Sequence, residues 1–251
     1  MITYARQTSL LTWRSLRALP RVPQRLLDVT LQPIIFILLF LYVFGSAIHI
    51  RGIDYHNFLM PGIIAQGLAF GMMGTGVATT NDMNEGVIDR FRSMPVSRIS
   101  ILSGQVMGQY CEQLVGLAVY GGIGYACGWR PQIGVELMAL TLLALLAFTW
   151  MGVFFGLLVR SPDAMQGLGF AVVFPLTFLA GTFVPISGMP AIPRAIGDWD
   201  PISAFVATIR KLAQGFPAHG SWMLDHCELA MLGWSLLLIA IFVPLALRRF
   251  N

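Results

Sequence analysis

Charge is scarce in this chain of 251 residues, and lysine almost absent. Only 11% of the residues are Asp, Glu, Lys or Arg, whereas roughly 25% is normal for a soluble domain. Lys211 is the single lysine, and hydrophobic residues make up 56% of the sequence. This composition argues against a soluble enzyme or binding domain and predicts an all-α integral membrane protein.

Motifs for catalysis are missing as well. The sequence has no G-x-x-x-x-G-K-[ST] pattern, so it does not hydrolyse ATP by a P-loop mechanism. It also has no G-x-S-x-G and no H-E-x-x-H, so serine hydrolysis and zincin chemistry lack support. The three cysteines, Cys111, Cys127 and Cys227, are interpreted as packing residues. We therefore expect no enzymatic activity, no metal site and no cofactor bound by this chain.

Long apolar runs are what the chain has in abundance. A helix needs about 20 apolar residues to cross a hydrocarbon core of about 30 Å. Six runs fit this length, and they predict transmembrane helices at residues 31–48, 58–80, 101–126, 133–159, 165–184 and 229–247. The prediction is a single transmembrane domain over residues 1–251, with spans 1 and 2 in 31–80, spans 3 and 4 in 99–159, span 5 and an outer segment in 165–217, and span 6 in 226–247.

Basic residues predict the orientation of these spans. With a cytoplasmic N-terminus, the inner segments hold 11 of the 16 basic residues: Arg6, Arg14, Arg17, Arg21, Arg25, Arg90, Arg92, Arg98, Arg160, Arg248 and Arg249. Both termini are therefore predicted to be cytoplasmic. Topology and contact with anionic lipid also account for the net charge of +4, so nucleic-acid binding is not needed to explain it.

Two segments outside the spans have amphipathic patterns. Residues 1–30 carry arginines at helical spacing and predict an interfacial helix on the cytoplasmic leaflet, with a basic tail as the alternative. Between spans 5 and 6, prolines interrupt an apolar segment that has helical periodicity up to Gly215. That segment is too apolar for a solvated loop, and it predicts short re-entrant helices in the outer leaflet.

The inner loop at residues 81–98 holds six of the 28 charged residues. Asp82 and Glu85 favour the N-terminal pole of a short helix, and Arg90 and Arg92 favour its other pole. The loop therefore predicts a surface helix, with an ordinary solvated connection as the alternative.

The order of these features resembles one transporter family. A basic lead-in helix and six spans accompany the inner D-R-F-R-S-M-P-V-S-R segment and the outer G-T-F-V-P, M-P and D-P-I-S patterns. Over nearly the whole chain, this layout is similar to type 2 ABC exporter permeases, and within them to the daunorubicin-resistance group. The resemblance implies a multi-pass protein of the prokaryotic plasma membrane that pairs with a second permease copy, identical or related.

The resemblance also implies two cytoplasmic ATPase subunits, which would bind the ATP and Mg. The surface helix would then be a coupling helix that docks on the ATPase. Its candidate residues are Asp82, Glu85, Ile88, Asp89, Arg90, Phe91, Arg92 and Met94.

A polar face interrupts the third span. Gln105, Gln109 and Glu112 recur at helical spacing, with Gln113 beside them. A carboxylate facing lipid at mid-span costs at least about 2.5 kcal/mol, so this face should look into protein or water. Two interpretations remain open: a lining of the translocation path, or an interhelical hydrogen-bond seam. In the fifth span, Pro175 is a candidate hinge, with simple packing as the alternative.

The function hypothesis is export of an amphipathic drug or lipid, driven by a separate ATPase. Phenylalanines suit the walls of a path for such a compound: Phe36, Phe40, Phe70, Phe174 and Phe178. One alternative is export of a lipid-linked saccharide or glycolipid by the same machinery. Others are an ion-coupled carrier with Glu112 as proton carrier, or a structural or enzymatic membrane protein.

Overall fold

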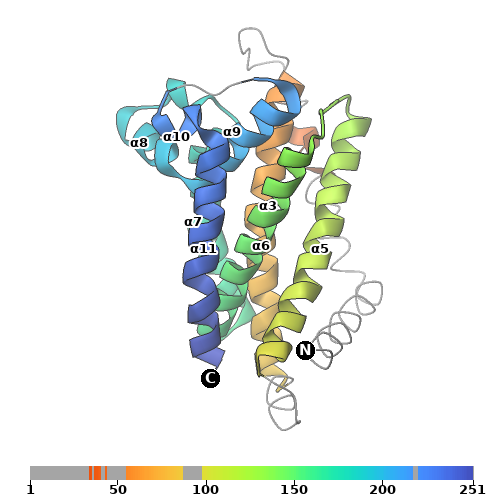
Figure 1. Ribbon diagram of the computed structural model, residues 1–251, viewed down its shortest axis with the longest axis vertical. Helices are drawn as coiled ribbons and strands as arrows, with labels where there is room; N and C mark the ends of the chain where they lie inside the picture. The colour runs from red at the N-terminus through yellow and green to blue at the C-terminus, as the bar shows by residue number, and fades with distance from the viewer. Residues whose placement is uncertain are drawn as a thin grey trace.

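The computed structural model describes residues 34–35, 37–40, 43, 55–86, 98–216 and 220–250, and this part of the chain is helical with no strand. Five long helices run side by side along the molecule (Figure 1): α3 Tyr55–Asn84, α5 Arg98–Ala126, α6 Val135–Leu158, α7 Pro162–Leu179 and α11 Cys227–Phe250. They form one bundle, in which α6 packs against both α3 and α11.

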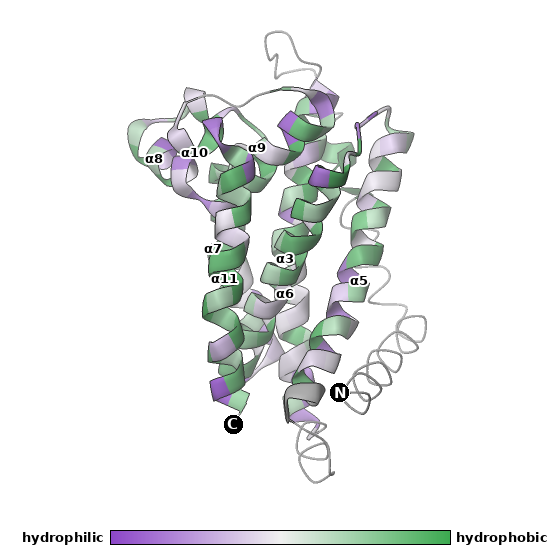
Figure 2. Cartoon of the chain, viewed as in Figure 1, coloured by the Kyte–Doolittle hydropathy of each residue, from purple (hydrophilic) through white to green (hydrophobic). Residues whose placement is uncertain are grey.

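Four of these helices are both long and apolar enough to cross a membrane: α3, α6, α7 and α11. They match the predicted second, fourth, fifth and sixth spans, and Figure 2 shows α11 apolar along most of its length. Helix α5 has 29 residues, but its glutamines and Glu112 keep it less apolar than the other four. Whether α5 crosses the membrane stays a prediction, and the predicted first span and the N-terminal helix lie mostly or wholly outside the described residues.

The ends of the bundle differ in character. At one end, Asn84 Nδ2 donates to Arg160 O at 3.4 Å, and Phe250 is buried in a cluster with Leu102 and Leu157. We call this the C-terminal end. All described segments predicted to be cytoplasmic meet there, although the side of the membrane that it faces stays a prediction.

The opposite end, here called the cap end, carries the short helices (Figure 1). They are a 3₁₀ helix at Ile186–Gly188, α8 at Ala191–Trp199, α9 at Pro201–Gln214 and α10 at Trp222–Asp225. Asp200 caps α9 by accepting a hydrogen bond from the backbone N–H of Ile202, and Gly215 ends it with φ of +72°. Short helices were predicted here, whereas their insertion into the outer leaflet remains a prediction.

A half-buried arginine joins the cap to the bundle. Arg210 of α9 donates from Nε and Nη2 to the carbonyl oxygen of Phe58 at 3.1 and 2.9 Å, and from Nη2 to Gly181 O at 2.8 Å. Its guanidinium also lies 3.6 Å from the ring centroid of Phe58. Burial lowers the pKa of Arg210 to about 9, so the group keeps its charge at neutral pH. One side chain therefore links α9 to the start of α3 and to the turn that follows α7.

Glycine allows close contact between two helices of the bundle. A Cβ added at Gly156 of α6 would lie 2.5 Å from Gly76 O and 2.7 Å from Thr79 Cβ of α3. Next to this contact, Thr80 Oγ1 donates to Gly156 O at 3.0 Å. Helices α3 and α6 are therefore held by close backbone approach and by a hydrogen bond between helices.

Candidate functional site

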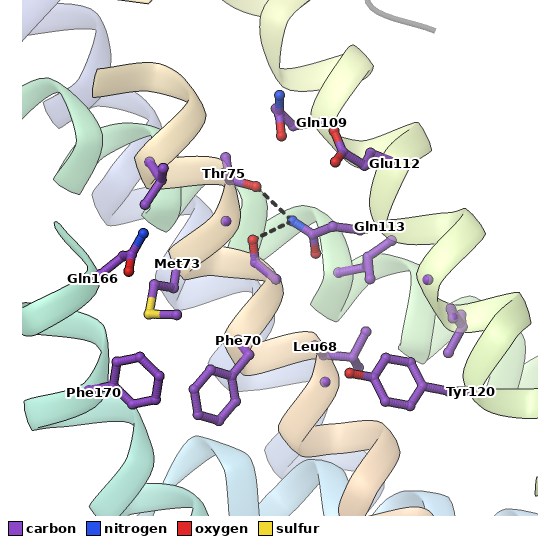
Figure 3. Close-up of a pocket in the computed structure, with 17 residues that line it drawn as sticks. Leu68, Phe70, Met73, Thr75, Gln109, Glu112, Gln113, Tyr120, Gln166 and Phe170 are labelled. Atoms are coloured by element: carbon purple, nitrogen blue, oxygen red, sulfur yellow. Dashed lines mark hydrogen bonds between the residues drawn. The ribbon is translucent and has the colours of Figure 1, made fainter. Parts of the chain in front are cut away.

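A cavity of about 420 Å³ lies at mid-height in the bundle, between α3, α5 and α7 (Figure 3). Its α3 wall contains Gly67, Gly71 and Gly74, which share one helix face. A Cβ at Gly74 would meet no atom within 4 Å, so this position opens directly into the cavity.

The cavity is polar toward the C-terminal end and aromatic toward the cap end. Gln109 and Glu112 of α5 and Gln166 of α7 lie on the polar side, while Phe70 and Phe170 lie toward the cap end (Figure 3). The helix directions fix this order, because α5 and α7 both run from the C-terminal end toward the cap end. The site thus offers hydrogen-bonding and anionic groups to one part of a ligand and aromatic faces to another.

Gln113 ties α5 to two neighbouring helices. Its Nε2 donates to Thr75 Oγ1 of α3 at 2.9 Å and to Thr149 Oγ1 of α6 at 3.1 Å. It also lies 3.3 Å from Gly71 O, while its Oε1 is buried with no hydrogen-bond partner among the described residues. Gln113 therefore forms an interhelical seam and also lines the cavity.

Gln105 lies closer to the C-terminal end and does not line the cavity. Its Nε2 donates to Asp82 Oδ2 at 3.1 Å and lies 3.3 Å from Thr79 Oγ1, which joins α5 to the last turns of α3. Of the four residues predicted on the polar face, three line the cavity and two make seam contacts. Gln113 belongs to both sets, and whether the cavity lies on a translocation path stays a prediction.

The predicted coupling segment is described only at its beginning. Asp82 lies in the last turn of α3, so the expectation that it begins a new helix is wrong, and Glu85 lies in the turn that follows. Helix α3 runs to Asn84, and Gly86 then leaves the helix with φ of +66°. The remaining predicted residues lie outside the described part of the chain: Ile88, Asp89, Arg90, Phe91, Arg92 and Met94.

Pro175 lies within α7, which continues beyond it to Leu179. Two residues later, Thr177 Oγ1 donates to Phe174 O at 2.7 Å, and Gln66 Nε2 lies 3.4 Å from the same hydroxyl. The proline removes one backbone N–H donor from α7. The contact between Gln66 of α3 and Thr177 holds α7 beside this position. Whether Pro175 acts as a hinge remains a prediction.

Comparison with known proteins identifies the family. Residues 6–213 match the model of the ABC-2 type transporter family. The chain belongs to this family. The permease is 31% identical over 243 residues to a daunorubicin resistance ABC transporter permease protein, DrrB1, of Streptomyces coeruleorubidus. The aligned residues cover 95% of this chain and 84% of the relative. It is 27% identical over 170 residues to a doxorubicin resistance ABC transporter permease protein, DrrB, of Mycobacterium tuberculosis, covering 62% and 56% of the two chains.

Several cavity residues of this ABC-2 permease were missed from sequence. Gln166 is a single amide in an apolar run, and Tyr120 is one of three tyrosines in the predicted third span, so neither stands out in the sequence. The glycines at 67, 71 and 74 share a helix face, which could have indicated a thin wall, but in a chain with 26 glycines the pattern is weak. Phe70 was expected in an aromatic wall, and it lines the cavity.

Proposed function

We propose that this permease is the membrane subunit of an ATP-driven exporter that moves an amphipathic drug-like compound or lipid out of the cytoplasm. The observation that carries the proposal is the mid-height cavity, polar on one side and aromatic on the other, in a relative of drug-resistance permeases. An amphipathic molecule can satisfy both sides at once, because its polar part meets Gln109 and Glu112 while its apolar part meets Phe70 and Phe170.

In this proposal, energy comes from two ATPase subunits that dock on residues 81–98. Closure of the ATPases on ATP moves this segment, and α3 moves with it because the segment includes the last turn of α3. The Gln105 contact to Asp82 then passes the movement to α5, and the Gly156 contact passes it to α6. Two permease copies switch between inward-open and outward-open arrangements, and the substrate must bind the two with different free energies.

Transport in inverted membrane vesicles tests the proposal. Vesicles that contain the permease and its ATPase should accumulate doxorubicin only when ATP and Mg are supplied. Vesicles with a non-hydrolysing ATPase variant are the control. Equal accumulation in both, or accumulation driven by a proton gradient without ATP, would contradict the proposal.

Docking is tested by Phe91→Asp. A carboxylate in an apolar docking contact should lower ATP-dependent transport at least about tenfold, because burying an unpaired charge is costly, and should leave membrane insertion intact. Ile133→Asp, an exposed position near the opposite end of the bundle, is the matched control. Unchanged ATPase co-purification and transport with Phe91→Asp would exclude this docking site.

A further inference from the structure

Six phenylalanine rings form a continuous series of contacts from the cavity toward the cap end. In order they are Phe70, Phe170, Phe174, Phe178, Phe183 and Phe40, and we call them the phenylalanine ladder. Successive ring centroids lie 5.9, 6.5, 4.8, 4.7 and 3.9 Å apart. Each separation but the last lies within the range of about 4.5–7 Å typical of aromatic pairs, and the last is a close stack.

The ladder begins where the cavity ends. Phe70 and Phe170 line the cavity, and the next two rings follow on α7 at intervals of one helical turn. Eight residues separate Phe170 from Phe178, which is about 12 Å of helix at the usual rise. The ladder therefore continues from the aromatic side of the cavity along α7 toward the cap.

Accessibility changes along the ladder. Phe170 is 51% exposed and Phe178 39%, whereas Phe70 is 9% exposed at the cavity, and Phe183 and Phe40 are 3% and 9% exposed at the far end. Phe170 and Phe178 can thus meet a ligand, while the stacked pair Phe183 and Phe40 closes the far end in this structure. Pro175 lies inside the ladder, between Phe174 and Phe178, where a bend in α7 would separate Phe170 and Phe174 from Phe178 and the closed pair.

We propose that the phenylalanine ladder is the outward path for a substrate with a planar aromatic body, which passes from ring to ring by exchange of stacking partners. This inference rests on the proposed function and adds the substrate class and its route. Movement along a path requires binding sites that are similar in strength and individually weak, so that no site traps the ligand. A row of identical side chains meets that requirement, since every step replaces one phenyl contact by another.

A second aromatic group in the same chain provides a matched control. Phe154, Phe155 and Phe242 lie within 5.4 to 5.7 Å of one another on α6 and α11. None of the three lines the cavity. A Phe→Leu change there removes the same ring from a helix contact of the same kind, but outside the proposed path.

The test compares two cations in vesicles that contain the permease and its ATPase. Ethidium has a planar fused ring, and dodecyltrimethylammonium has none. Phe174→Leu and Phe178→Leu should slow ATP-dependent ethidium uptake about threefold to tenfold, the loss expected from one stacking contact. Uptake of dodecyltrimethylammonium should change less than about twofold, because leucine keeps the apolar surface. Phe242→Leu should change neither.

Three results would overturn the ladder. One is an equal loss of both cations in the α7 variants, and another is an equal loss of ethidium in Phe242→Leu. The third is a fall in recovered permease dimers in Phe174→Leu and Phe178→Leu, which would make this face of α7 an interface between copies.

A binding measurement separates failure of the ladder from failure of the exporter proposal. In a background without native cysteines, ethidium should slow maleimide labelling of Phe178→Cys and leave Phe242→Cys unaffected. If the wild-type complex transports neither cation with ATP, the proposed function fails. Absence of protection at Phe178→Cys in a complex that does transport ethidium would instead refute the ladder alone.

Discussion

At the scale of single residues, neighbours on α5 have different surroundings. Glu112 and Gln113 are about 100° apart on the helix. Gln113 reaches Thr75 and Thr149, whereas Glu112 lies beside Gln109 on the cavity (Figure 3). The amide therefore has a clear structural role, and the carboxylate is placed where a ligand can reach it.

Glu112→Gln is expected to reduce transport of cations selectively. The substitution keeps size and hydrogen-bonding capacity but removes the negative charge from the cavity wall. ATP-dependent vesicle uptake of a cationic amphiphile should fall about tenfold, which corresponds to about 1.4 kcal/mol of lost interaction, while a neutral analogue is unaffected.

Gln113→Leu is the matched control. It should lower the melting temperature of the purified permease, because it leaves two threonine hydroxyls without their amide partner. If Glu112→Gln lowers uptake of both substrates equally together with the melting temperature, Glu112 belongs to the seam as well.

The buried carboxyl of Asp200 makes the stability of the cap depend on pH. Its side chain is 4% exposed, and burial raises its pKa from 3.8 to about 7, despite the backbone N–H groups of Ile202 and Ser203, which act in the opposite direction. Because the folded pKa is raised, its stabilising contribution is fully present below about pH 4 and is lost as pH rises through about 7. The cap should therefore be less stable at pH 8.5 than at pH 5.5, by up to about 2 kcal/mol.

Hydrogen exchange over residues 186–216 at the two pH values measures this effect, after correction for the intrinsic exchange rate. Asp200→Asn keeps the side-chain oxygen that caps α9 and removes the titration, so its protection should not depend on pH. Asp163→Asn, at an exposed carboxyl, should behave as wild type. A wild-type pH dependence that persists in Asp200→Asn would assign it to another group.

At the scale of helices, the close packing of α3 and α6 predicts that a glycine-to-alanine change lowers stability at this contact, whereas the same change at an open position raises it. Gly156→Ala places a methyl group against Gly76 O and Thr79. Overpacking of this kind costs about 1–3 kcal/mol, so the melting temperature should drop by several degrees.

Gly167→Ala on α7 is the control, because a Cβ there meets nothing within 4 Å. It should raise stability slightly, since alanine is favoured over glycine in a helix by about 1 kcal/mol. Equal responses of the two variants in a thermal melt would show that the α3 to α6 contact relaxes without cost.

The helices were largely predictable from apolar length, and their ends were not. The predicted span at 58–80 becomes Tyr55–Asn84, because polar residues near a membrane surface can extend a helix beyond its apolar part. The predicted span at 165–184 stops at Leu179, since Gly181 adopts a positive φ of 69°. The cavity could not be predicted, because it depends on how three helices are rotated relative to one another.

The same limit applies to residue roles. Periodicity placed Gln105, Gln109 and Glu112 on one face of the third span, but it could not show which partner each residue would meet. Gln105 meets Asp82 near the end of α3, whereas Gln109 and Glu112 reach the cavity further along α5. Arg210 is a residue whose partners the sequence did not indicate at all. A basic residue in an outer segment is expected to be solvated, but in the fold its guanidinium packs against three carbonyl groups.

At the scale of the whole molecule, the basic side chains at the two ends have different surroundings. At the cap end, Arg210 is half-buried and bonded to carbonyl oxygens, Lys211 Nζ lies 2.7 Å from Glu228 Oε1, and Arg194 Nε lies 3.9 Å from Asp198 Oδ2. At the C-terminal end, Arg248 and Arg249 lie in the last turn of α11, where positive charge favours the helix dipole. Basic residues retained in the cytoplasm orient membrane proteins, whereas buried or paired cations at the cap are compatible with translocation.

This distribution predicts that the cap end faces outward. In a permease without native cysteines, Gly188→Cys should react in intact cells with a maleimide that cannot cross the membrane. Asp163→Cys should react only after the membrane is opened. Both positions are exposed, and a Cβ at Gly188 meets nothing within 4 Å, so access to the reagent decides the result. Reaction of Asp163→Cys in intact cells, with Gly188→Cys protected, would reverse the orientation. It would also place the segment at 81–98 outside the cell, where an ATPase could not dock.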